Sequence, residues 1–252
     1  EIIKEAKDLN INIKSSYVVV TAKGYKKVKS ADIAKISDDK KNLSNIENIK
    51  CDCICVSGFW TPTIHLASQS GNKTKFNSDI DAFVPGESKQ NEKTLGAANG
   101  VFNLDETIKS SFETGFELSN KITKNENKVS FPNVMEKKSS IHDKFWCVPL
   151  PKGKHYKRFL DFQNDVAVSD IQLALREGYR SIEHVKRYTT LGMATDQGKT
   201  SNLNGLQLVS EVENKVVPQV GHTTFRPPYT PVSIGAIVGR EIGKHSKPTR
   251  KS

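Results

Sequence analysis

The segment from Asp161 to Met193 constrains the fold most, because it carries the clearest helical pattern in the chain. It reads DFQNDVAVSDIQLALREGYRSIEHVKRYTTLGM. Its apolar residues recur at the three- and four-residue spacing of two amphipathic helices. The first is marked by Val168, Ile171, Leu175 and Tyr179 and ends near Gly178, and the second is capped by Ser181 and carries Ile182, Val185 and Tyr188. A third helix is predicted from Thr200 or Ser201 to about Val212.

Strand patterns dominate the N-terminal part of the chain. After a short amphipathic helix in EIIKEAKDL, two alternating runs on either side of Gly24 predict a β-hairpin over residues 17–36. Residues 41–47 are polar and favour a loop, whereas the apolar run IKCDCICVSG favours a buried strand. Residue 1 is Glu and the helical pattern begins at once, so we expect the chain to begin within a domain.

The cysteines indicate a reduced, cytoplasmic protein. Four are present, at positions 51, 53, 55 and 147, and they form neither a CxxC pair nor the spacing of secreted domains. On a strand, Cys51, Cys53 and Cys55 would leave by one face about 7 Å apart, so they could converge on one zinc ion only if the strand were broken. A core strand is the favoured interpretation, because buried Cys behaves as a small apolar residue.

The middle of the chain indicates the closing half of an α/β domain. The segment GFWTPTIHL predicts a turn and a helix start, and GAANGVFNLDE precedes an amphipathic helix. The apolar face of that helix comprises Val101, Leu104, Ile108, Phe112 and Phe116. Residues 123–141 are polar and without period, so a linker is expected. The proline-rich tail is not expected to be helical before Pro231.

Composition excludes several classes. No run of about 18 apolar residues exists, so no membrane span is expected. The formal net charge of +10 would suit a nucleic-acid-binding module, but the basic residues are scattered among Asn, Ser and Asp, which favours a solvated surface. GxSxG, HExxH and paired CxxC motifs are all missing, so no catalytic or metal-ligating residue is assigned. The histidines at 65, 142, 155, 222 and 245 are expected at the surface or as capping residues.

The segment DQGKTS resembles the end of a phosphate-binding P-loop, but the match fails. Five residues separate Gly192 from Gly198, where that motif requires four, and the preceding segment is helical rather than a strand. Lys199, the hydroxyls of Thr200 and Ser201 and the amides of a helix start could still face one point and attract an anion, with Arg187 and His184 nearby. Plain helix capping is an equally good interpretation.

A longer segment resembles a known family. The stretch FLDFQNDVAVSDIQLALREGYRSIEHVKRYTTLGMATDQGKTSNLNGL, followed by GHTTFRPPYTPVSIGAIVGR, is similar to the alpha subunit of heterotetrameric sarcosine oxidase over residues 145–240. Weaker motifs of the same subunit occur in CDCICVSGFWTPTIHL and TLGAANGVFNL.

The resemblance implies an oxidoreductase that oxidises the N-methyl group of sarcosine with O₂. Its products are glycine, H₂O₂ and 5,10-methylenetetrahydrofolate. In that family NAD and a folate domain belong to the alpha subunit, FMN lies at the alpha/beta interface, and FAD and zinc are expected in other subunits. The implied partners are the beta, gamma and delta subunits.

The resemblance also implies the fold and its division. We expect a mixed α/β chain that contains the C-terminal half of a pyridine-nucleotide-disulfide-oxidoreductase-like Rossmann domain over residues 1–120. A linker over 121–144, a small helical ferredoxin-like module over 145–215 and the start of an aminomethyltransferase-like folate domain over 216–252 would follow. In related modules the loops that correspond to LDFQND and TDQGKTS carry cluster cysteines, and neither contains Cys here, so no iron–sulfur cluster is expected.

The cofactor contacts follow from the same resemblance. For NAD they are Gly96, Ala97, Ala98, Asn99, Leu104 and Glu106; the other interpretation of this segment is a packing corner between strand and helix. For FMN or its phosphate they are Arg187, Lys199, Thr200, Ser201 and Arg226. Another multisubunit amine or dimethylglycine-type oxidase or dehydrogenase is the alternative enzyme, and a basic noncatalytic binding module is the alternative of another class.

Overall fold

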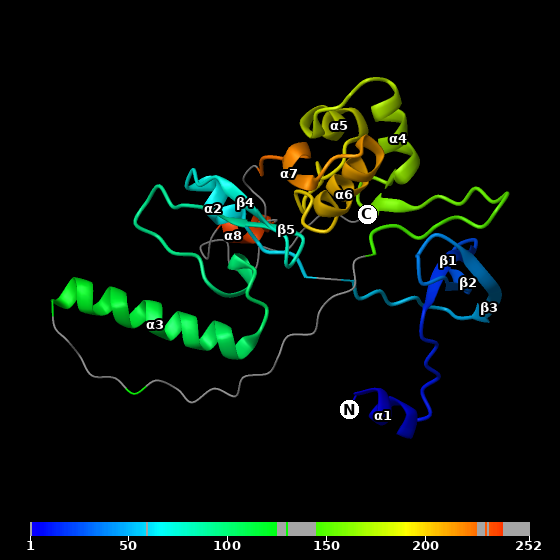
Figure 1. Cartoon of the computed structure of the whole chain (residues 1–252), viewed down its shortest axis with the longest axis horizontal. Helices are drawn as coiled ribbons and strands as arrows, with labels where there is room; N and C mark the ends of the chain where they lie inside the picture. The colour runs from blue at the N-terminus through cyan, green and yellow to red at the C-terminus, as the bar shows by residue number, and fades with distance from the viewer. Residues whose placement is uncertain are drawn as a thin grey trace. The chain divides into compact units, whose positions relative to one another are not determined.

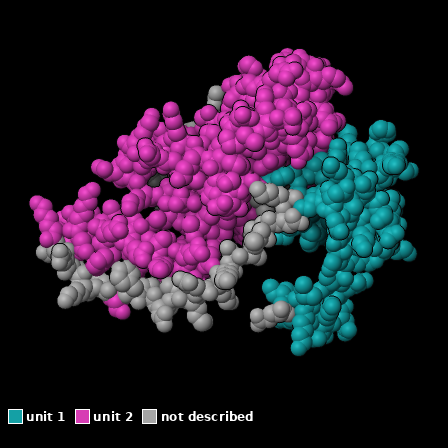
Figure 2. All heavy atoms as spheres, viewed as in Figure 1, with its two compact units in different colours: residues 1–59, 143–158 teal, residues 60–142, 159–252 magenta. Residues whose placement is uncertain are grey.

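The chain forms two compact units, which are described separately. A computed structural model describes residues 2–58, 60–124, 130, 145–225, 230 and 232–238 (Figure 1). The first unit comprises residues 1–59 and 143–158, and the second comprises residues 60–142 and 159–252 (Figure 2).

The first unit contains a three-stranded antiparallel sheet. Helix α1 (Ile2–Asp8) precedes strands β1 (Tyr17–Gly24), β2 (Val28–Ile36) and β3 (Leu43–Lys50), which lie in the order β1-β2-β3. The predicted helix and hairpin are therefore confirmed. The loop predicted over residues 41–47 is wrong, because β3 pairs with β2 from Ile36↔Leu43 to Ser30↔Lys50. Ladder hydrogen bonds hold this polar segment in the sheet despite its low apolar content.

The predicted core strand of cysteines is also wrong. No strand is assigned to residues 51–58, and the Cys53 and Cys55 thiols are exposed with their Sγ atoms 3.9 Å apart. The last ladder contact is Cys51 N–H donating to Lys29 O over 3.2 Å. Since β2 begins at Val28, the chain beyond Cys51 has no strand left to pair with.

The second unit begins with short elements and one long helix. Helix α2 (His65–Gln69) is followed by the antiparallel pair β4 (Thr74–Asn77) and β5 (Ala82–Pro85), the 3₁₀-helix η1 (Gly96–Asn99) and helix α3 (Leu104–Thr123). The Asn103 side chain caps α3 by accepting from two backbone amides. The two helices expected here are confirmed, although Val101 precedes α3. Residues 121–123 belong to α3, and of the rest of the expected linker only Lys124 and Ser130 are described.

Residues 159–225 form a helical module with its own core. A small hairpin, β6 (Phe159–Asp161) and β7 (Val166–Ala167), leads into α4 (Val168–Arg176), α5 (Ile182–Thr189), α6 (Asn202–Glu213) and α7 (Val217–Val220). The three predicted helices are confirmed, whereas the hairpin and α7 were not foreseen. The fully buried apolar side chains of this core include Ile171, Val185, Leu191 and Val209. In the tail, α8 (Ile234–Val238) starts only after Pro231, as predicted.

The fold class is mixed α/β, as predicted at that level. All strand pairs among the described residues are antiparallel. No helix in the described ranges is long and apolar enough to cross a membrane.

Candidate functional site

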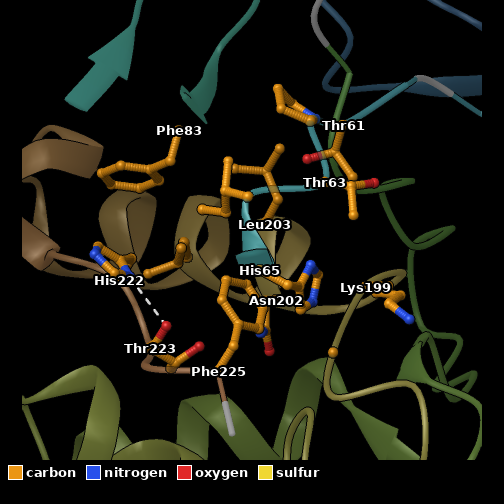
Figure 3. Close-up of a pocket in the computed structure, with 14 residues that line it drawn as sticks. Thr61, Thr63, His65, Phe83, Lys199, Asn202, Leu203, His222, Thr223 and Phe225 are labelled. Carbon is orange, nitrogen blue, oxygen red and sulfur yellow. Dashed lines mark hydrogen bonds between the residues drawn. The ribbon is translucent and has the colours of Figure 1, made fainter. Parts of the chain in front are cut away.

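A small cavity lies inside the second unit, between two segments far apart in sequence. One wall comes from residues 61–65 and the other from the start of α6, and residues 222–225 run across one side (Figure 3). The cavity has a volume of about 90 Å³. Its lining is mainly apolar and aromatic and includes Pro62, Ile64, Phe83, Leu203, Leu206 and Phe225.

The wall formed by α2 is held against residues 222–225 by direct contacts. The His65 side chain is buried, at 3% exposure, and its ring lies 3.9 Å from that of Phe225, measured between centroids. The Gln69 side-chain amide donates to the Phe225 carbonyl over 2.6 Å. The surface or capping position expected for His65 is therefore wrong, because the turn of α2 directs the ring into the interior.

Burial sets the charge of His65. The pKa of this imidazole is lowered from 6.5 to about 4, chiefly by its loss of solvation and then by the Lys199 ammonium, while Asp196 acts in the opposite direction. His65 is therefore neutral at physiological pH. A neutral imidazole in an apolar wall can donate a hydrogen bond to a small ligand, or accept one from it, without placing a charge in the cavity.

The opposite end of the cavity carries a second histidine. His222 Nδ1 lies 2.9 Å from Thr223 O, and its ring lies 5.1 Å from that of Phe83. Because a carbonyl only accepts, Nδ1 carries the proton, and Nε2 of the neutral ring is an acceptor. His155, by contrast, is exposed, as expected, and the predictions for His142 and His245 fall outside the described residues.

The loop between α5 and α6 is shaped by its glycines and by Asn202. Gly192 and Gly198 have positive φ values of 66° and 75°. A Cβ at either position would meet the Asn202 side chain at 2.1 Å. The Asn202 side-chain amide thus occupies the space that a side chain at Gly192 or Gly198 would need. Gly198 and Asn202 also line the cavity.

The two loops that carry cluster cysteines in related modules lie together in this chain. Asp161, 2% exposed, accepts from the Gly192 amide over 2.8 Å. Gln163 accepts from the Thr195 hydroxyl over 3.1 Å and from the Asp196 amide over 3.4 Å. Side-chain oxygens therefore join the loops, and no group of three or more His, Cys, Asp or Glu suited to a metal ion exists among the described residues.

The residues predicted to contact FMN do not converge. The Thr200 hydroxyl is exposed and donates to Asp196 over 3.0 Å, whereas the Ser201 side chain is fully buried. Arg187 is ion-paired with Glu183 one helical turn away, and His184 is exposed. The idea that the two hydroxyls face one point is therefore wrong, because the Ser201 side chain points into the core while the Thr200 hydroxyl and amide bind Asp196.

Of the four members of that set that the structure describes, Lys199 alone lines the cavity. In Figure 3 its ammonium points away from His65, at the edge of the cavity. Arg226 lies outside the described residues. Asp196, which the sequence analysis passed over, supplies a negative charge next to the cationic residues and changes the electrostatics of the loop.

The residues predicted to contact NAD form one corner of the second unit. Gly96 is buried, and a Cβ there would lie 2.9 Å from Thr107 Cγ2, so its small size permits packing against α3. Ala97 and Asn99 are exposed and Ala98 is half-buried. Leu104 and Glu106 lie exposed on the first turn of α3. Because Asn103 occupies the first amides of this helix, these amides are not open to a phosphate.

Sequence reasoning missed the residues that build the cavity. His65, Phe83, His222 and Phe225 come from three separate segments without a common motif, and only the fold brings them together. One local signal existed, because His65 directly follows the buried Ile64 and is the first residue of α2, where the chain turns inward.

Comparison with known proteins assigns the helical module to a class. Residues 155–240 match the family of the sarcosine oxidase A3 domain. Three curated relatives are all sarcosine oxidase alpha subunits. The chain is 40% identical over 213 residues to the protein from Rhizobium meliloti (strain 1021), and 34% identical over 226 residues to that from Corynebacterium sp. (strain U-96). The resemblance read from the sequence is therefore confirmed, and the chain is a relative of sarcosine oxidase alpha subunits.

The match covers most of this chain and little of its relatives. It includes 82% of the chain and 21% of the Rhizobium meliloti protein, and 88% of the chain and 23% of the Corynebacterium protein. Among solved structures, the L-proline dehydrogenase from P. horikoshii superposes with a TM-score of 0.53 at 19% identity, over 94% of this chain and 47% of that one. This second similarity concerns the fold alone.

Proposed function

We propose that the chain is part of the alpha subunit of a sarcosine oxidase. The whole enzyme would convert sarcosine, tetrahydrofolate and O₂ into glycine, 5,10-methylenetetrahydrofolate and H₂O₂. The observation that carries this proposal is the match of residues 155–240 to the A3 domain family, together with relatives of that name at 31–40% identity. The segment assigned here would act by holding cofactors and subunits, with no catalytic residue of its own.

The proposed division of the chain follows from the same resemblance. Residues 1–120 would complete a Rossmann-type dinucleotide domain, residues 145–215 would be a ferredoxin-like module without a cluster, and residues 216–252 would begin a folate domain. The hydrogen bonds that join Asp161 and Gln163 to the facing loop support a module whose former ligand loops now serve packing. A cytoplasmic location remains a prediction based on the cysteines.

For NAD, the proposed contacts are residues 96–99 with Leu104 and Glu106. The exposed Ala97 and Asn99 leave room for a ligand to approach. The Asn103 cap already binds the amides of Asp105 and Glu106, so we expect the pyrophosphate to be held by another part of the domain. Bound NAD would supply hydride-transfer chemistry, and these residues would hold and orient it.

For FMN, the proposal narrows to Lys199 and Arg226. Lys199 lies at the edge of the cavity, where an ammonium can approach a phosphate or a developing flavin anion of a neighbouring subunit. The burial of Ser201, the Thr200–Asp196 hydrogen bond and the Arg187–Glu183 ion pair count against the other three residues. Bound FMN would supply the one- and two-electron chemistry.

The activity is tested on the complex that copurifies with the full-length protein. Oxygen uptake is followed with sarcosine, dimethylglycine and L-proline as separate substrates. We expect sarcosine to give the highest kcat/KM, with one H₂O₂ and one glycine formed per O₂. A preference for dimethylglycine or proline would instead support another amine oxidase or dehydrogenase, and the absence of turnover with all three would contradict the proposal.

The cofactor assignment is tested by Lys199→Ala in the same complex, with Lys215→Ala as a matched control. Lys215 also belongs to the module but does not line the cavity, and its ammonium is paired with Glu213. We expect the first variant to lose FMN and sarcosine turnover and the second to keep both. Unchanged FMN content and turnover in Lys199→Ala would remove this residue from the cofactor site.

A further inference from the structure

A second hollow, separate from the cavity of Figure 3, lies beside the β4–β5 hairpin. It has a volume of about 390 Å³ and is lined by two short segments. These are residues 73–75, at the start of β4, and residues 86–89, which follow β5. Both segments belong to the second unit. None of the proposed cofactor contacts within the described ranges lines this hollow.

The lining is strongly basic. Lys73, Lys75 and Lys89 are exposed, and none of them forms an ion pair with a residue that the structure describes. Glu87 is the one acidic residue of the lining, so three positive charges face one negative charge. Three lysines and one glutamate give this lining a net charge of +2, which favours the approach of an anion.

The backbone holds these lysines in place. The Gly86 amide donates to Lys73 O over 2.9 Å, and a Cβ at Gly86 would lie 2.2 Å from that oxygen, so this close approach requires glycine. The Lys89 amide donates to Asn72 Oδ1 over 2.8 Å, and the amide nitrogen of the same side chain donates to Glu92 over 2.5 Å. The segment that carries Lys89 is thus fixed to the segment that carries Lys73 before any ligand arrives.

A polar group in the same lining lacks a partner. The Thr74 hydroxyl oxygen is shielded from solvent and has no hydrogen bond. A shielded hydroxyl without a partner costs free energy, so Thr74 adds an unused donor and acceptor beside the lysines.

We propose that this hollow is a binding site for the phosphate groups of a small molecule. Phosphate and pyrophosphate combine two or more negative charges with many acceptor oxygens, which suits several lysine ammonium groups better than a single carboxylate would. No aromatic residue belongs to the lining, so stacked bases of a polynucleotide would find no support.

The experiment is lysine-acetylation footprinting of the full-length protein, read by peptide mass spectrometry, with NAD kept saturating so that a dinucleotide site elsewhere does not contribute. The probes are inorganic phosphate, inorganic pyrophosphate and ADP, with adenosine as the ligand without phosphate. Sodium chloride is added to equal ionic strength in every arm. Lys109 and Lys121 on α3 are the internal controls, because both are exposed lysines of the same unit.

We expect pyrophosphate and ADP to slow acetylation of Lys73, Lys75 and Lys89 severalfold and saturably, and to leave Lys109 and Lys121 unchanged. Protection by ADP far beyond that by pyrophosphate would identify a nucleotide, and equal protection would identify the free anion. Absence of protection, equal protection of the controls, or protection by adenosine would overturn the site.

Charge-matched variants provide a second measurement. The double variant Lys73→Gln/Lys75→Gln and the control Lys109→Gln/Lys121→Gln remove the same charge from exposed positions. In the NAD-saturated protein we expect the first to weaken pyrophosphate binding by about tenfold or more and the second to leave it within about twofold. Equal weakening in both variants would show a general ionic effect and overturn the proposal.

Discussion

Helices α6 and α3 are both amphipathic, but they differ in how much of their apolar surface is covered. Eight of the twelve residues of α6 are buried, whereas none of the twenty residues of α3 is. Helix α6 contacts α4 and α7, and Gly205 lets Leu191 pack close to its backbone. Helix α3 contacts η1 near its start. Periodicity therefore predicts a helix, but it does not tell whether the apolar face has a partner within the same unit.

The sharpest test of this difference compares the same substitution in both helices. Leu206 of α6 is 3% exposed, and Leu118 of α3 is 43% exposed. We expect Leu206→Ala to lower the free energy of unfolding by about 2–5 kcal/mol, because it leaves a cavity in a packed core. Leu118→Ala should cost less than about 1 kcal/mol. Urea unfolding of the 252-residue chain, followed by circular dichroism, measures both.

The same pair can also break the comparison. If Leu118→Ala is as destabilising as Leu206→Ala in this chain, α3 has a packing partner that its exposure does not reveal. Repeating the pair in the full-length protein then tells whether further sequence covers α3. A cost that rises only in the longer protein would identify α3 as a surface that packs against the rest of the subunit.

A pH titration measures how tightly the module encloses His65. The folded-state pKa is lowered to about 4 from 6.5, so the unfolded chain binds a proton at a higher pH than the folded chain does. Stability is therefore complete above pH 6.5 and is lost as the pH falls toward 4, by on the order of 2–3 kcal/mol. The measurement is the urea midpoint at neutral and at acidic pH.

The control for His65 is His184, a histidine of the helical module. His65→Gln should remove much of the pH dependence between 6.5 and 4, whereas His184→Gln, at an exposed position, should leave it in place. If the two variants behave alike, the His65 ring is solvated and the wall of the cavity is not closed.

Two glycines, Gly198 before α6 and Gly178 after α4, separate backbone strain from crowding. Gly198 and Gly178 both have positive φ, but a Cβ at Gly198 would meet Asn202 at 2.1 Å, whereas a Cβ at Gly178 would meet nothing within 4 Å. Gly178→Ala should cost roughly 1–2 kcal/mol from strain alone. Gly198→Ala should cost roughly 1–3 kcal/mol more. Equal losses of thermal stability would show that the Asn202 side chain moves freely.

The smallest effect is expected at the surface of the module. Arg187→Ala removes an ion pair within one helical turn, whose arginine side chain is 56% exposed. We expect no measurable change in the melting temperature, because exposed pairs of this kind contribute little. A clear loss of stability would mean that the module is packed through to its surface and that Arg187 has a further contact.

The sequence predicted the helices and strands better than it predicted which residues each of them packs against. The helices α4, α5 and α6 follow from apolar spacing and from Ser and Gly at their ends, and the hairpin β1–β2 follows from alternation. Strand β3 was missed because its polar residues are held by ladder hydrogen bonds rather than by burial. The cysteine segment was misassigned because an apolar run does not reveal that the neighbouring strand β2 begins only at Val28 and offers no partner beyond it.

The site was less predictable than the fold for a related reason. The DQGKTS segment was recognised as distinctive, and Lys199 does line a cavity. The partner wall comes from residues more than 130 positions earlier, so no local spacing could have indicated it. Asp196 was overlooked because the motif directed attention to cations, although a loop with many free amides needs an acceptor.

The central claim is that this chain belongs to an enzyme complex whose flavin is reduced by sarcosine. The direct measurement is an anaerobic titration of the complex isolated with the full-length protein, read from its flavin absorbance. We predict that sarcosine bleaches the flavin and that admitting O₂ restores the oxidised spectrum with formation of H₂O₂. A flavin that stays oxidised with sarcosine, or a complex that contains no flavin, would contradict the account.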